Sequence, residues 1–329
     1  MKSVWPQGFV RVPEEDWTQA PVEELALKYD TVEQHGWYKN LDPTVAELGA
    51  HLGPGSLVLD YSGGTGILAV RLLDSLPGLD FGVLIADASP KFLRLALNKL
   101  GGEERVAFRL LRYLKEARRL QTMQEVLEPA ALERGFDAVA STNAIHLYYD
   151  LEDTLRSWRK LLAPGGKVFV QSGNIGLSEM EPDTWIIDAT VEAIQAAAIA
   201  RVQSEERWAA FRPVLGDAEK MAAYDALRRK IFLPVRPLDY YLAALEAAGF
   251  ESLTVRHQKL EAQVSEWREF LAAYHEGVLG WAGGVAKIAG QEPTPEAVAA
   301  RLELLALSLN DIFSGRPSFQ AVWTYITGR

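Results

Sequence analysis

Asp60 stands at the start of a glycine-rich segment, Asp60-Tyr61-Ser62-Gly63-Gly64-Thr65-Gly66, which directly follows an apolar run. Glycines lack a side chain and let the backbone approach a ligand closely. Loops of this kind usually hold phosphates, but a carboxylate repels phosphate and attracts an ammonium group. The segment therefore predicts a site for a small ligand that carries positive charge.

Two kinds of ligand remain open for this loop. The stretch Gly64-Thr65-Gly66-Ile67-Leu68-Ala69 satisfies G-x-G-x-x-A, a dinucleotide-binding pattern, and Asp87 follows at about the spacing of a ribose-binding acid. That interpretation indicates an NAD(P)-dependent oxidoreductase. The longer pattern D-x-G-x-G-x-G matches residues 60–66 except at Ser62, and it accounts for Asp60 as well.

The surrounding sequence predicts the elements that hold these residues. Short apolar runs at 57–60, 82–87, 105–108, 136–141 and 167–172 alternate with helical patterns, of which 110–134 is a long one. Continuous apolar strands between helices are typical of a parallel sheet covered on both faces. Ligands of such sheets bind at the carboxyl ends of the strands, where Asp60 and Asp87 are expected.

The chain resembles the class I S-adenosylmethionine-dependent methyltransferases of the small-molecule type. The resemblance rests on the loop at 60–66, on LIADASP at 84–90, and on the run from Phe136 to Val170 with its Leu162-Ala163-Pro164-Gly165-Gly166 turn. It implies an α/β fold with a Rossmann-like, doubly wound sheet that is mostly parallel, has an antiparallel last strand and carries helical insertions as a cap.

The resemblance also implies S-adenosyl-L-methionine as the cofactor. Asp60 would then help to hold the methionine ammonium, and Asp87 would accept hydrogen bonds from the ribose hydroxyls. Ser62 replaces the first glycine of the family's pattern, which a serine tolerates if its φ is negative. The cofactor-binding residues predicted in this way are Asp60, Ser62, Gly63, Gly64, Gly66, Asp87, Ala88 and Asn143.

Methyl transfer needs alignment and, for some acceptors, a base. His146 follows the fourth strand and is the best-placed base candidate, but related enzymes often have a residue here that packs over the cofactor instead. The arm segment at 29–38 resembles cofactor-covering segments of related enzymes, so we expect an enclosed, largely apolar pocket there. The predicted substrate-contacting residues are Tyr29, Trp37, Tyr38, Tyr148, Tyr149 and His275.

Spacing and composition set the remaining expectations. We expect a helical arm at 1–40, a cofactor-binding sheet domain at 41–176, helical inserts at 177–236 and 261–316, a return to the sheet at 237–260, and a final strand at 317–329.

The inserts could form a roof over the site, or only extra core or a dimer surface. The chain has 329 residues, a formal charge of −10 and no cysteine.

These values exclude several classes of function. The acidic balance disfavours nucleic acid as a partner, because phosphate binding needs clustered Lys and Arg. No cysteine ligands exist, and the five histidines show no metal spacing. No secretory signal or membrane span is expected, which fits a cytoplasmic protein, and a homodimer is possible. A small-molecule methyltransferase is the main hypothesis; a non-catalytic binding protein is, like the oxidoreductase, an alternative.

Overall fold

A mixed sheet forms the centre of the molecule in the computed structural model, which describes residues 3–329. Its order is β11-β12-β7-β6-β1-β2-β3, and β12 runs antiparallel to both of its neighbours. The predicted Rossmann-like sheet with an antiparallel last strand is therefore confirmed. The strands are β1 (Ser56–Tyr61), β2 (Phe81–Asp87), β3 (Val106–Leu110), β6 (Phe136–Thr142), β7 (Leu162–Ser172), β11 (Thr254–Gln263) and β12 (Ser318–Gly328).

Helices cover both faces of the sheet because alternate strand residues point to opposite sides. Leu57 and Leu59 of β1 belong to one apolar cluster, whereas Val58 belongs to the cluster on the other face. The first face is covered by α7 (Pro129–Arg134), α8 (Leu151–Leu161) and α12 (Leu238–Ala247), and the second by α3 (Asp42–His51), α4 (Ile67–Ser75) and α5 (Pro90–Leu100).

The helix predicted over 110–134 is wrong in its first half. A small hairpin of β4 (Tyr113–Leu114) and β5 (Arg119–Leu120) precedes the short helices α6 (Met123–Val126) and α7. Arg118 has a φ of 53°, which turns the chain between the two strands. Thr122 and Glu125 form a capping box, so the helix begins only there.

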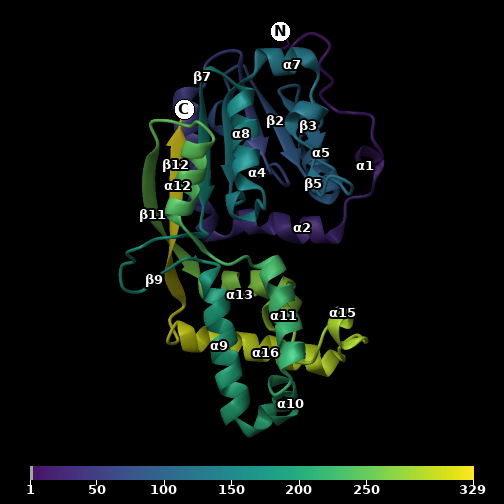
Figure 1. The fold of residues 1–329 in the computed structure, drawn as a ribbon, viewed down its shortest axis with the longest axis vertical. Helices are drawn as coiled ribbons and strands as arrows, with labels where there is room; N and C mark the ends of the chain where they lie inside the picture. Colours follow the sequence, from purple (N-terminus) through teal and green to yellow (C-terminus); the bar gives the residue numbers. More distant parts are fainter. Residues whose placement is uncertain (1–2) are drawn as a thin grey trace.

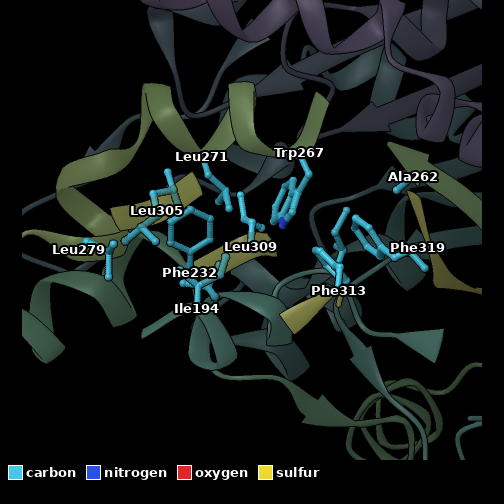
Figure 2. Packing of buried hydrophobic residues seen from close by; sticks show 14 of the residues in the cluster. Ile194, Phe232, Ala262, Trp267, Leu271, Leu279, Leu305, Leu309, Phe313 and Phe319 are labelled. Carbon is cyan, nitrogen blue, oxygen red and sulfur yellow. The ribbon is translucent and has the colours of Figure 1, made fainter. Parts of the chain in front are cut away.

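The two inserts fold into one helical cap, which lies beneath the sheet in Figure 1. Their apolar side chains share a single core, and Figure 2 shows Trp267, Leu271 and Phe232 within it. Three short strands, β8 (Ile175–Gly176), β9 (Thr184–Trp185) and β10 (Arg236–Pro237), lie in or beside the first insert. The helices of the cap are α9 (Ala189–Ser204), η4 (Glu206–Phe211), α10 (Arg212–Leu215), α11 (Ala218–Ile231), α13 (Val264–Ala273), α14 (His275–Leu279), α15 (Ala286–Ala289) and α16 (Pro295–Ile312).

Two predicted boundaries differ in the structure. The return to the sheet predicted at 237–260 ends with β11, which continues to Gln263, so the helices of the second insert begin at Val264 and not at residue 261. The extension pairs residue by residue with β12, as far as Gln263 opposite Ser318. The first insert is not wholly helical, since β9 returns to pair with β12.

The N-terminal arm, predicted over 1–40, is described from residue 3 and is helical only in part. It contains four short pieces, α1 (Asp16–Gln19), α2 (Glu24–Asp30), η1 (Thr31–Gln34) and η2 (Gly36–Leu41). In Figure 1, α2 crosses the molecule between the sheet and the cap. Ion pairs join the arm to α5, between Asp30 and Lys99 at 2.8 Å and between Glu23 and Lys91 at 2.5 Å.

No helix within residues 3–329 is long and apolar enough to cross a bilayer. Over the same residues, His, Asp and Glu side chains form no group of three or more that could hold a metal ion.

Candidate functional site

The glycine loop joins β1 to α4 and takes its shape from three glycines. Gly64 and Gly66 have φ of 55° and 81°, values in the left-handed region that favours glycine. Gly63 is needed for a different reason, because a Cβ there would lie 2.5 Å from Asp60 Oδ2. A Cβ on Gly64 would meet nothing within 4 Å, so open space adjoins the loop at this position.

Asp60 is fully buried at the end of β1, and neither of its carboxylate oxygens has a hydrogen-bond partner. Burial, together with the charge of Asp87, raises the pKa of Asp60 to about 8. An unpartnered buried carboxylate is costly for the fold. A ligand ammonium beside Asp60 would supply the missing donor, so the residues present fit the methionine end of S-adenosylmethionine.

Asp87 ends β2 and faces the same loop. Its Oδ2 accepts a hydrogen bond of 2.9 Å from the Gly64 amide, and its Oδ1 accepts one of 2.7 Å from the Ser89 amide. Burial raises the pKa of Asp87, an effect that these backbone amides oppose. Asp87 thus fixes the loop against β2, and the next residue, Ala88, is exposed beside it.

Ser62 does not have the negative φ that its side chain was expected to require. Its φ is 61°, and its Oγ accepts a hydrogen bond of 3.0 Å from the Tyr148 hydroxyl. Tyr148 also contacts Ser141 Oγ at 2.9 Å. The turn is therefore held by a polar contact to the segment after β6, in place of the usual glycine.

Ser62→Gly and Ser62→Ala should separate these two effects. In Ser62→Gly, the left-handed φ no longer costs strain energy, but the hydrogen bond from Tyr148 is lost. Each effect amounts to about 1 kcal/mol and they have opposite signs, so the free energy of unfolding should change little. Alanine loses the hydrogen bond and keeps the strain, so it should be about 1 kcal/mol less stable than glycine at this position. Urea unfolding of both variants measures the difference, and an alanine variant as stable as the glycine variant would contradict it.

An apolar cavity of about 250 Å³ lies between the arm, the carboxyl ends of β6 and β7, and the cap. Tyr29, Trp37 and Tyr38 line it from the arm, and His146 and Asn143 line it from the segment after β6. The structure thus brings together three of the predicted substrate-contacting residues and the predicted base. The cap contributes Ile231, Phe232, Trp267, Phe270 and Tyr274, α5 contributes Phe92, and β12 contributes Trp323.

Two ionisable side chains meet in this cavity. His146 Nε2 lies 4.0 Å from Asp188 Oδ2, and His146 Nδ1 lies 3.1 Å from Ser172 Oγ. Burial, and then the charge of Arg236, lowers the pKa of His146 to about 4. Burial raises the pKa of Asp188 to about 7. Near neutral pH the imidazole is uncharged, and Asp188 is the more basic of the two groups.

The remaining predicted residues lie outside the cavity lining. Tyr149 is 76% exposed. Tyr148 packs edge-on against Tyr61 and Trp158 behind the loop. His275 lies in the cap, where its Nδ1 is 2.9 Å from an Arg301 guanidinium nitrogen. The structure therefore does not bring Tyr148, Tyr149 or His275 to the cavity with the others.

Asp188 and Asn174 are polar residues of the cavity lining that were not predicted from the sequence. Asp188 directly precedes α9, so in sequence it looks like an ordinary residue at the start of a helix. Asn174 is buried after β7, and its Oδ1 has no hydrogen-bond partner. Both residues lie in the irregular segment after β7. Neither the periodicity of the sequence nor the spacing of its residues therefore indicates that they belong to a site.

Residues 59–168 match the family model described as a methyltransferase domain. The match runs from β1 into β7 and contains Asp60, the glycine loop, Asp87 and Asn143. These residues are a class I methyltransferase domain. Domains of this class use S-adenosylmethionine, which agrees with the buried, unpartnered carboxylate of Asp60.

The chain also has a curated relative. The hybrid PKS-NRPS synthetase apdA of Emericella nidulans is 29% identical over 114 residues, 34% of this chain. The chain spans about 3% of the length of that relative.

Solved structures with methyltransferase names share the fold in outline. Phosphoethanolamine N-methyltransferase 2 of Haemonchus contortus is 14% identical, with a TM-score of 0.49 over 92% of this chain and 56% of that chain. A methyltransferase of Geobacter sulfurreducens bound to S-adenosylhomocysteine is 15% identical, with a TM-score of 0.45 over 92% and 97% of the two chains.

Proposed function

We propose that this chain transfers the methyl group of S-adenosylmethionine to a small-molecule acceptor held in the aromatic cavity. The observation that carries the proposal is the unpartnered carboxylate of Asp60 beside the glycine loop, at the same edge of the sheet as the cavity. Asn143, which the sequence predicts to contact the cofactor, also lines the cavity.

The chain's own residues would hold the cofactor as follows. Asp60 would pair with the methionine ammonium, and the backbone at Gly64 would lie against the ligand. Asp87 would face the ribose, with Ala88 beside the adenine. When bound, S-adenosylmethionine supplies an electrophilic methyl group whose departing sulfur keeps the electron pair of the broken bond.

Calorimetry with three ligands tests the cofactor assignment. We expect S-adenosylmethionine and S-adenosylhomocysteine to bind and NAD not to bind, because the pyrophosphate of NAD would lie beside Asp60. Asp87→Ala should weaken the binding of S-adenosylmethionine and of S-adenosylhomocysteine by about 1.5–3 kcal/mol, which is the contribution expected of hydrogen bonds to a charged group. Saturable NAD binding without S-adenosylmethionine binding would favour an oxidoreductase instead.

The arm should respond to the cofactor. Tyr29 stacks on Phe92 with ring centroids 4.8 Å apart, so α2 covers the start of α5 next to Asp87. A closed arm of this kind must open to admit ligands. We therefore expect slower amide hydrogen exchange across 25–40 when S-adenosylmethionine is added. Unchanged exchange there, with the cofactor bound, would remove the arm from the entry route.

A further inference from the structure

We propose that the acceptor is an uncharged, aromatic molecule whose hydroxyl group binds between His146 and Asp188. This inference rests on the proposed function, because it names the class of molecule that the cavity takes. It concerns binding and orientation of the acceptor, and it is carried by the polar groups of the cavity and by the absence of lysine and arginine from its lining among residues 3–329.

The spacing of His146 and Asp188 suits one bridging atom. Their nearest atoms are 4.0 Å apart, which is too far for a direct hydrogen bond. An oxygen that makes hydrogen bonds of about 2.8 Å to both would do so at an angle near 90°, which a hydroxyl group accepts. A hydroxyl can receive one hydrogen bond and donate the other, so it satisfies both neighbours at once.

Ser172 sets the direction of these hydrogen bonds. Its Oγ accepts a hydrogen bond of 3.0 Å from the Asn174 amide and lies 3.1 Å from His146 Nδ1, and we infer that its hydroxyl hydrogen is donated to Nδ1. His146 then carries its hydrogen on Nε2, from which it donates a hydrogen bond to the hydroxyl oxygen of the bound methyl acceptor. Asp188, on the other side, accepts the hydrogen of the bound hydroxyl.

The cavity offers an anion no cationic side chain. Among residues 3–329, no Lys or Arg lines it. The charge of Arg236 lowers the pKa of His146, but Arg236 is not among the lining residues, and the Tyr240 hydroxyl lies 3.1 Å from one of its guanidinium nitrogens. Asn174 also lines the cavity, and its buried Oδ1 has no hydrogen-bond partner. A phosphate or carboxylate would meet two acceptors, Asp188 and Asn174, with no charge to balance it.

The rest of the lining favours a flat ring. Trp37 stacks on Trp323 with centroids 5.9 Å apart and planes 18° apart, and it meets Phe270 edge-on at 6.4 Å. Trp267 stacks on Phe270 at 5.2 Å. Aromatic walls in these orientations pack well against another planar group.

A matched set of naphthalene probes tests the proposal. Each is titrated calorimetrically at pH 7 into protein saturated with S-adenosylhomocysteine. We expect 2-naphthol to bind at least tenfold more tightly than naphthalene, 2-naphthoate or 2-naphthylmethylammonium. Tightest binding of the naphthoate or the ammonium probe would overturn the class, and equal binding of naphthol and naphthalene would overturn the bridging hydroxyl.

Variants then locate the hydroxyl. Asp188→Ala should reduce the tenfold preference for 2-naphthol over naphthalene to about twofold or less, while naphthalene itself binds unchanged. Asp188→Asn keeps an oxygen acceptor and should retain most of the preference. An Asp188→Ala protein that keeps the full preference contradicts the assignment. If a variant fails to fold, the ranking of the four probes on the unaltered chain still decides the class.

The same titrations separate this inference from the proposed function. If S-adenosylhomocysteine does not bind in the first step, the cofactor assignment fails. If it binds and the probes rank in another order, only the acceptor class fails.

Discussion

Gly64→Val should weaken S-adenosylmethionine binding at least thirtyfold, which corresponds to about 2 kcal/mol. In the structure a Cβ at this position enters open space beside the loop, where the proposed cofactor would lie. A branched side chain would therefore occupy the ligand's space. Because Gly64 also has a φ of 55°, the substitution strains the backbone as well, by about 1–2 kcal/mol.

Gly55→Val is the matched control for that strain. Gly55 has a φ of 79°, and a Cβ there also meets nothing within 4 Å, but it precedes β1 at the opposite edge of the sheet. Both variants should lose similar stability in urea unfolding, and only Gly64→Val should lose affinity in calorimetry. Equal affinities for the two variants would place the cofactor away from this loop.

Asp60 should make the cofactor-free protein less stable as the pH rises. Its carboxyl has a pKa of about 8 in the folded chain and an ordinary value of 3.8. Between these values the folded state holds a proton that the unfolded state has released, so the free energy of unfolding falls with increasing pH. The total fall is of the order of several kcal/mol, and it ends above about pH 8.

Asp60→Asn should remove this part of the pH dependence. Denaturant unfolding between pH 4 and pH 9 measures the free energy of unfolding of both proteins. The value for Asp60→Asn should rise relative to that of the unaltered chain up to about pH 8, and the difference should then stay constant. Asp188, with its pKa raised to about 7, contributes a slope of the same sign in both proteins and cancels in the comparison. A stability difference that does not change with pH would contradict the buried, protonated state of Asp60.

The same carboxyl links cofactor binding to a proton. An ammonium beside Asp60 favours the charged form and lowers its pKa, so S-adenosylmethionine should release close to one proton on binding near pH 7. Calorimetry in buffers of different ionisation heat measures that proton. Asp60→Asn should bind weakly and release none, whereas release by the variant would assign the proton to another group.

The sequence placed Asp60, the glycine turn and Asp87 at one edge of the sheet, because their signals are local. Asp60, the glycine turn and Asp87 each follow a short apolar strand, and one backbone geometry fixes all three. Ser62 was placed correctly, but its φ was not, since the hydroxyl of Tyr148 that holds it belongs to a distant segment.

The acceptor side depends on contacts between segments far apart in the chain. Trp37, Asp188 and Trp323 come from the arm, the first insert and β12. Nothing in residue spacing indicates that these three meet, and tryptophans pack cores as readily as they line cavities. Trp281, for example, is buried in the core of the cap and is not among the cavity-lining residues.

The place of β12 in the sheet has a kinetic consequence. This strand lies between β7 and β11, with Thr324 opposite Ser172 on one side and His257 on the other. Both inserts must fold back before these pairs can form, and such long loops slow folding. The five neighbouring strands β1, β2, β3, β6 and β7 of the main sheet, which carry the cofactor loop, can pair without β12. During refolding, the cofactor half of the site should therefore assemble before the cavity, which gains Trp323 only when β12 docks.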